Sequence, residues 1–92
     1  MNESIIRRRA IVRGRVQGVF FRDSTRDQAQ AAGVAGSVRN REDGAVEVIL
    51  EGRADAVERV LAFSRVGPHQ ARVEDVEVTE EEPQGLGSFD VD

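Results

Sequence analysis

The chain has 92 residues, a formal net charge of −4, and a basic set made up of Arg alone, with no Lys and no Cys. This composition excludes disulfides, thiolate nucleophiles, thiolate metal sites, Schiff-base lysines and Walker-type phosphate binding. The length predicts one small domain over residues 1–92, and a single His69 argues against a zinc site, so we expect no metal and no other cofactor.

The first predicted elements are a strand and a helix. Ile and Val are frequent from Ile5 to Arg13, which indicates a strand. The triplet Arg7-Arg8-Arg9 interrupts the alternation and favours a solvated edge strand that resists pairing. Helical spacing covers residues 21–32, and Gly33 is placed to end that helix in a left-handed conformation. Two adjacent aromatic residues usually place one ring in the core, so we expect either Phe20 or Phe21 to be buried there.

A hairpin follows the first helix. Val34 to Asn40 is expected to form its first strand, Arg41 to Gly44 a tight turn, and Ala45 to Glu51 its second strand. Gly52 is expected to break that strand.

The last third of the sequence predicts a helix and up to two strands. Apolar residues recur at helical spacing over residues 57–64, and Gly67-Pro68 ends that segment. Residues 71–79 are expected to form a strand, and residues 89–91 a short final edge. Between these two segments, residues 80–84 indicate a solvated connection.

The order strand, helix, strand, strand, helix, strand is the βαββαβ arrangement of the ferredoxin-like sandwich. In this α+β fold two helices lie on one face of an antiparallel sheet.

Charge is unevenly distributed along the sequence. Residues 1–22 hold six Arg and one acid, whereas residues 73–92 hold eight acids and no base. We therefore expect an anionic ligand to be drawn to the N-terminal third. The longest apolar runs are too short to span a bilayer or form a signal peptide, so we expect no membrane association and a cytoplasmic location. Nothing in the sequence demands more than a monomer.

The stretch Gly14–Arg22, with sequence GRVQGVFFR, lies where the first strand is expected to become the first helix. Main-chain N–H groups in such a loop can converge on one point, and the helix N-terminus adds free donors and a favourable dipole for an anion. A phosphate fits best, because the Arg22 guanidinium can match two of its oxygens and stays charged. Taken alone, such a loop is more often a tight connection, and Arg22 an ion-pair partner of Asp23 or Asp27.

A second motif runs from Gly36 to Asn40, with sequence GSVRN, and continues through Asp43-Gly44. In the predicted topology it brings Asn40 near the sheet end that carries the Gly14–Arg22 loop. A carboxamide there can accept a proton of a water molecule, donate to a neighbouring oxygen, and hold that water in line with a bound phosphorus. Taken alone, Asn40 is most simply a turn residue.

Together the patterns G-x-V-Q-G-V-x-F-R and G-x-V-R-N-x-x-D-G-x-V-E closely resemble the motifs of the acylphosphatases. The resemblance covers about residues 11–51, and residues 67–68 with 71–73 are similar to the family's second-helix exit and fourth strand. A lone glycine loop would be weak evidence, but two separated motifs in order make the resemblance specific.

The resemblance implies hydrolysis of the carboxyl–phosphate bond of small acyl phosphates by direct attack of water, with neither metal nor covalent intermediate. It implies that Arg22 holds the phosphate and that Asn40 orients the water. The phosphate cradle would consist of the main-chain N–H groups of Arg15, Val16, Gln17, Gly18, Val19, Phe20 and Phe21. Because an acyl phosphate has a good leaving group, the enzyme needs mainly to position water and stabilise charge on the phosphoryl oxygens.

Two departures from the family pattern keep other functions open. Ser37 stands where many members carry Trp, which we expect to affect packing, and an acidic Asp92 near the cradle would weaken phosphate affinity. The main alternative is therefore a phosphate- or anion-binding module without turnover. A second alternative, nucleic-acid binding through Arg7-Arg8-Arg9, is disfavoured by the negative net charge and by the absence of Tyr and Trp.

Overall fold

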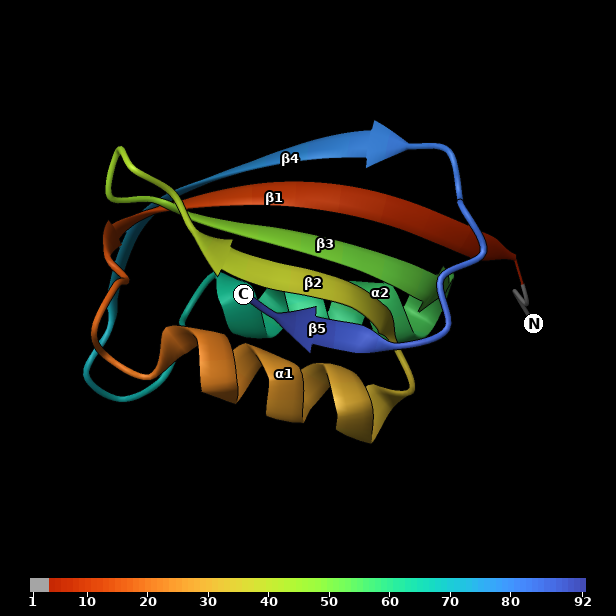
Figure 1. Cartoon of the computed structure of the whole chain (residues 1–92), viewed down its shortest axis with the longest axis horizontal. Coiled ribbons are helices and arrows are strands. Elements are labelled where there is room, and N and C mark those ends of the chain that lie inside the picture. Colours follow the sequence, from red (N-terminus) through yellow and green to blue (C-terminus); the bar gives the residue numbers. More distant parts are fainter. Residues whose placement is uncertain (1–3) are drawn as a thin grey trace.

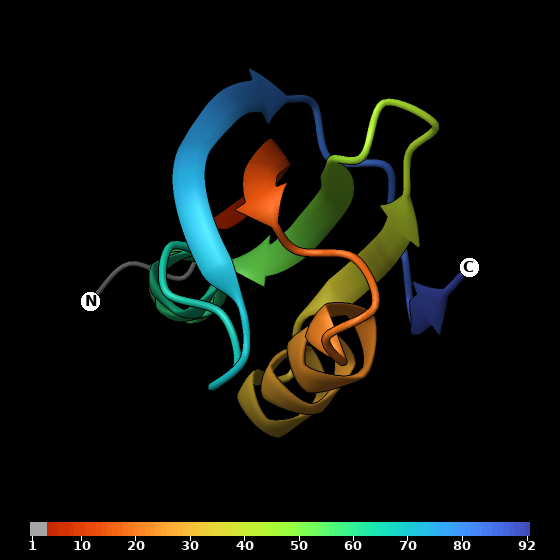
Figure 2. The ribbon, with the colours of Figure 1, turned by 90° about the vertical axis from the view of Figure 1, so that its left-hand side faces the viewer.

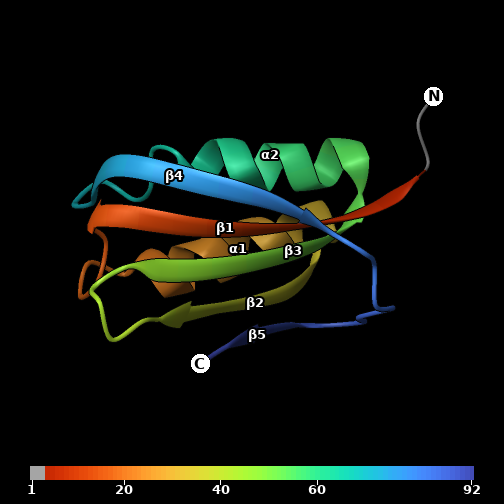
Figure 3. The same ribbon diagram turned by 90° about the horizontal axis from the view of Figure 1, so that it is seen from above.

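The computed structural model describes residues 4–92. Five strands form one sheet in the order β4-β1-β3-β2-β5, and both helices pack on the same face of it (Figures 1 and 3). This arrangement confirms the predicted ferredoxin-like α+β fold. The elements are β1 (Ile5–Arg15), α1 (Phe21–Ala32), β2 (Ala35–Asn40), β3 (Val46–Arg53), α2 (Ala54–Ser64), β4 (Arg72–Glu81) and β5 (Phe89–Val91).

Four of the strands pair antiparallel, as expected, and the fifth runs parallel to its neighbour. β1 pairs with β3 and β4, and β2 pairs with β3. β5 lies parallel to β2, with Gly36 opposite Phe89 and Val38 opposite Val91. The chain reaches that edge through the connection after β4, which passes around one end of the sheet (Figure 1).

The expectation that the first strand occupies a solvated edge is wrong, because β1 lies between β4 and β3. Its arginines are accommodated by acids on both neighbours. Arg7 is only 8% exposed, and its guanidinium lies 3.2 Å from Glu51 and 2.8 Å from Glu81. Arg8 pairs with Glu80 and Arg9 with Glu47. The triplet is thus no free basic cluster, which removes the observation behind nucleic-acid binding.

Two predicted boundaries also differ from the structure. β3 continues through Gly52, where a break was expected, and α2 follows directly at Ala54. β4 extends through Glu80 and Glu81, which were expected in the solvated connection. These two residues stay in the strand because it pairs with β1 up to Arg7 opposite Glu81.

The core lies between the sheet and the two helices. Phe21 is 1% exposed and Phe20 is 71% exposed, so one ring of the aromatic pair lies in the core as expected. Gly33 has a φ of 71° and ends α1 as predicted. The start of α1 and the turn between β2 and β3 lie at the same end of the molecule (Figure 2). That end therefore brings the two sequence motifs together.

Candidate active site

The loop between β1 and α1 contains two residues in the left-handed conformation. Gly18 has a φ of 72° and Phe20 a φ of 63°. Phe20 is the only residue other than Gly with a positive φ among residues 4–92. Such a conformation costs a residue with a side chain roughly 1–3 kcal/mol and is concentrated at functional sites. Left-handed residues in a short loop turn successive N–H groups toward one side, which makes an anion-binding concavity.

The main-chain donors of this loop are free of protein partners. Across the described part of the chain, no acceptor bonds the N–H groups of residues 17–23, and no side chain caps α1. The first main-chain bond of the helix runs from the Ser24 N–H to the Phe20 carbonyl over 3.0 Å. These donors and the positive end of the α1 dipole are therefore available to an anion.

A hollow of about 270 Å³ opens at this point, and Arg22 and Asn40 both line it. Typical sites for drug-sized ligands range from about 300 to 1,000 Å³, so the hollow suits a small ligand. The other lining residues are Val16, Gly18, Phe20, Phe21 and Asp23.

Three members of the predicted cradle, Arg15, Gln17 and Val19, are not among the residues that line this hollow. Arg15 is the last residue of β1 and pairs with Arg72. Val19 is buried, at 3% exposure. Gly14 forms a bulge against β4, where a Cβ would approach the Arg72 carbonyl oxygen to 2.1 Å, so only glycine fits there.

Asn40 ends β2, and its side-chain oxygen is buried without a hydrogen-bond partner among the described residues. An unsatisfied buried acceptor costs roughly 1–3 kcal/mol, so such atoms are rare. Asn40 is also one of the residues that line the hollow. Asn40 thus lies beside the loop that contains Arg22, which is where the topology was expected to bring it.

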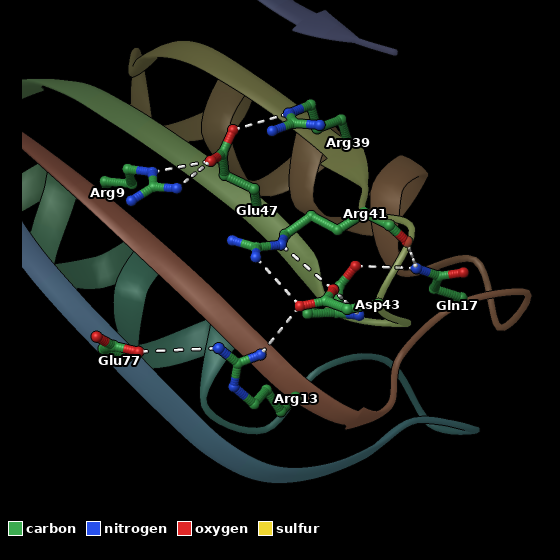
Figure 4. Close-up of polar contacts among 9 residues, drawn as sticks. Arg9, Arg13, Gln17, Arg39, Arg41, Asp43, Glu47 and Glu77 are labelled. Carbon is green, nitrogen blue, oxygen red and sulfur yellow. Dashed lines mark hydrogen bonds and ion pairs between the residues drawn. The ribbon is translucent and has the colours of Figure 1, made fainter.

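Gln17 has a role that the sequence did not reveal. Its side-chain amide donates to the carbonyl oxygens of Arg41 (2.8 Å) and Ala45 (2.9 Å), both in the turn between β2 and β3 (Figure 4). The turn is further held by the Ala45 N–H, which donates to Asp43 over 3.1 Å. Gln17 thereby ties the β1–α1 loop to the segment that directly follows Asn40.

Most cations around this end of the molecule are already paired. Asp43 lies 3.5 Å from Arg13 and 3.1 Å from Arg41 (Figure 4). The Ala45 N–H, and after it the two guanidinium groups, lower the pKa of Asp43 despite some desolvation. Glu47 pairs with Arg9 and Arg39 in the same way. The uneven charge of the sequence is thus largely neutralised in the fold.

Arg22 differs from those arginines. No carboxylate side chain within residues 4–92 lies at ion-pair distance from it. Asp23 and Asp27, its partners in the alternative interpretation, contact Arg26 instead. Its Nη1 donates to the main-chain oxygen of Asp92 over 2.5 Å. The guanidinium is therefore fixed in place while most of its donors stay available to a ligand.

Comparison with known proteins identifies the family. The family model described as "Acylphosphatase" matches residues 8–91. The chain belongs to the acylphosphatase family. It is 56% identical to an acylphosphatase of Pyrobaculum calidifontis, over 88% of this chain and 74% of the relative. It is also 56% identical to an acylphosphatase of Rubrobacter xylanophilus, over 84% of this chain and 70% of the relative.

A solved acylphosphatase has the same fold. The crystal structure of the acylphosphatase from Bacillus subtilis matches with a TM-score of 0.90 at 37% identity, covering 94% of this chain and 97% of that one. The resemblance stated from the two motifs is confirmed, and the enzyme class is acylphosphatase, which hydrolyses small acyl phosphates. Within residues 4–92, no helix has the length and hydropathy needed to cross a membrane.

Proposed function

We propose that this acylphosphatase carries out its reaction in the hollow between the start of α1 and the end of β2. The phosphate would bind the main-chain N–H groups of residues 15–21 and the Arg22 guanidinium, and the attacking water would bind Asn40. The convergence of a guanidinium that has no carboxylate side chain as a partner, a buried carboxamide oxygen and free N–H donors on one small hollow supports this assignment.

The reaction needs one bond made and one broken. The water oxygen attacks phosphorus as the bond between phosphorus and the carboxyl oxygen breaks, so carboxylate leaves and inorganic phosphate remains. A carboxylate is a stable leaving group and needs no proton from the enzyme. The Asn40 oxygen accepts a hydrogen bond from the water without removing its proton, which stays with the phosphate product. Arg22 and the main-chain N–H groups stabilise the charge spread over the phosphoryl oxygens.

The observation that carries the proposal is the unsatisfied oxygen of Asn40. An Asn that served only the turn would have its buried oxygen bonded within the protein, since nearly all buried polar atoms are. Here the turn is held by Gln17 and Asp43 instead. The carboxamide is left free for a water molecule at the phosphate.

We further propose that the chain acts as a monomeric cytoplasmic enzyme on a small acyl phosphate, with no nucleic acid or membrane as a partner and with residues 1–92 as its one domain. The pairing of most basic side chains with acids agrees with a small ligand rather than a polyanion. Size-exclusion chromatography with light scattering tests the monomer.

Hydrolysis of benzoyl phosphate in the presence of a chelator tests the proposal. The wild type is expected to turn over, and Arg22→Ala and Asn40→Ala are each expected to lower kcat/KM by about 10²-fold or more while remaining folded. Arg59→Ala, which removes an exposed arginine from α2, is the matched control. Full activity in either site variant would refute the residue roles. Stabilisation by inorganic phosphate with no turnover would instead favour the binding module.

A further inference from the structure

Phe20 is a lining residue of the hollow and presents a large apolar ring to solvent. Its residue exposure is 71%, and its main chain is held in the left-handed conformation that disfavours a side chain. Glycine would relieve that strain, and a polar residue would remove the exposed apolar surface. Neither the core nor the proposed phosphate cradle uses the ring, because the cradle needs only the main-chain N–H of this residue.

The position of the ring relative to the cradle suggests its use. Once the phosphate occupies the N–H donors and Arg22, the acyl group must extend away from them along the lining of the hollow. Two lining residues there, Val16 and Phe21, are each 1% exposed and offer little surface. Phe20 is the lining residue that offers a broad apolar face to an acyl group.

Asp23 adds a charge to the same hollow. It is an exposed lining residue in the first turn of α1. The nearest guanidinium, that of Arg26, lies 3.9 Å from its carboxylate. The phosphate engages Arg22, so a second negative charge on the acyl group would face Asp23 with no cation of its own. Two like charges about 4 Å apart repel each other by about 1 kcal/mol even in water, so an anionic acyl group packed against Asp23 would bind less well.

We propose that Phe20 and Asp23 set the acyl-group specificity of this enzyme. They select acyl phosphates with an uncharged, apolar acyl group, aryl groups foremost, and disfavour acyl groups that carry a carboxylate. This inference rests on the proposed phosphate site and adds a substrate class to it. The ring acts by packing against the acyl group, and the carboxylate acts by repulsion.

The test measures kcat/KM for benzoyl, acetyl and succinyl phosphate, whose acyl groups are aromatic, small and anionic. Phe20→Ala is expected to lower the ratio of kcat/KM for benzoyl phosphate to kcat/KM for acetyl phosphate about three- to tenfold, because this is the effect of losing one aromatic contact. Phe20→Tyr keeps the ring and should keep that ratio. Asp23→Asn is expected to raise the ratio of succinyl to acetyl phosphate about threefold. Val66→Ala, which truncates an equally exposed apolar residue outside the hollow, should change neither ratio.

Damage to the cradle would lower kcat/KM for every substrate alike, so ratios of kcat/KM between substrates report specificity alone. The inhibition constant of inorganic phosphate reports the state of the cradle independently. Equal losses for benzoyl and acetyl phosphate in Phe20→Ala would overturn the role of the ring. An unchanged succinyl-to-acetyl ratio in Asp23→Asn would overturn the role of the carboxylate. A wild type that hydrolyses none of the three would overturn the proposed reaction and this inference with it, whether or not inorganic phosphate still binds.

Discussion

The Arg22 guanidinium and the main-chain oxygen of Asp92 lie 2.5 Å apart, although the two residues are 70 positions apart in the sequence. Asp92 directly follows β5 and is held against β2, since its own N–H donates to the Val38 carbonyl over 3.0 Å. Phe89 anchors the same strand and is 9% exposed. A three-residue strand thus positions the cation assigned to the phosphate.

Truncating Phe89 tests this coupling. Phe89→Ala is expected to destabilise the protein by about 3 kcal/mol, as large-to-small core substitutions do. It should also raise KM for benzoyl phosphate, because Arg22 loses its fixed partner. Thermal unfolding measures the loss of stability. Enzyme kinetics at a temperature well below the unfolding midpoint of the variant measure the change in KM. Leu86→Ala, in the exposed connection before β5, is the control and should change KM little. An unchanged KM in folded Phe89→Ala would show that β5 does not position Arg22.

Two glycines allow strain to be separated from phosphate binding. Gly18 and Gly33 have φ values of 72° and 71°, and a Cβ at either would meet nothing within 4 Å. Gly18→Ala and Gly33→Ala should each cost about 1 kcal/mol through the left-handed conformation alone. Only Gly18→Ala should weaken inhibition by inorganic phosphate, since Gly33 lies at the far end of α1. Equal phosphate affinities in the two variants would contradict a cradle at Gly18.

Gln17 links the cradle to the turn after Asn40, so its loss should affect the water more than the phosphate. Gln17→Ala is expected to lower kcat about tenfold, because the water is less well positioned, with a smaller change in KM. The lost bonds should also lower the free energy of unfolding by about 1–2 kcal/mol. Gln30→Ala, on the exposed face of α1, is the matched control. A change in KM alone would contradict the role of Gln17.

Local signals account for what the sequence predicts correctly. The glycine loop, the turn at Arg41–Gly44 and the helix end at Gly33 each depend on a few adjacent residues. The meeting of the two motifs at one end of the sheet follows from the order of the predicted elements in the ferredoxin-like fold. The interior position of β1 could not be predicted in the same way. Arg7 can be buried because it pairs with Glu51 and Glu81. These partners lie 44 and 74 positions along the chain, so no local pattern indicates them.

The same reasoning explains what was missed at the site. The side-chain bonds of Gln17 reach the turn 24 and 28 positions along the chain, and no local pattern marks them. The contact of Arg22 with Asp92 depends on β5 running parallel to β2. Residue types therefore indicate the chemistry of the site, whereas its supports arise from pairing between distant segments.

Glu51 is a buried carboxylate that organises the connection to β5. It accepts hydrogen bonds from the N–H groups of Gln84 (2.8 Å), Gly85 (2.7 Å) and Leu86 (2.9 Å) and from Arg7 (3.2 Å). Burial alone would raise the pKa of Glu51, but these four donors outweigh it and lower that pKa below its ordinary value of 4.5. The folded state thus favours the ionised form.

The stability of the protein should therefore depend on pH through Glu51. A lowered folded pKa contributes stability that is present above the ordinary value and is lost as the pH falls through the folded value. Glu51→Gln should cost about 3 kcal/mol at pH 7, because its NH₂ group would face N–H donors and Arg7 would lose its buried partner. Urea unfolding of both proteins at pH 7 and near pH 3 measures this. The difference in free energy of unfolding between wild type and Glu51→Gln, called the gap here, should be smaller in acid. A gap that is independent of pH would contradict this account.

The most direct test of the central claim is a titration with inorganic phosphate followed by NMR. The main-chain amide signals of residues 17–23, the Arg22 Nε–H and the Asn40 side-chain amide are all observed. These signals are expected to shift together with a single dissociation constant, because the groups surround one hollow. Shifts of Arg22 without Asn40, or with a different dissociation constant, would contradict this expectation.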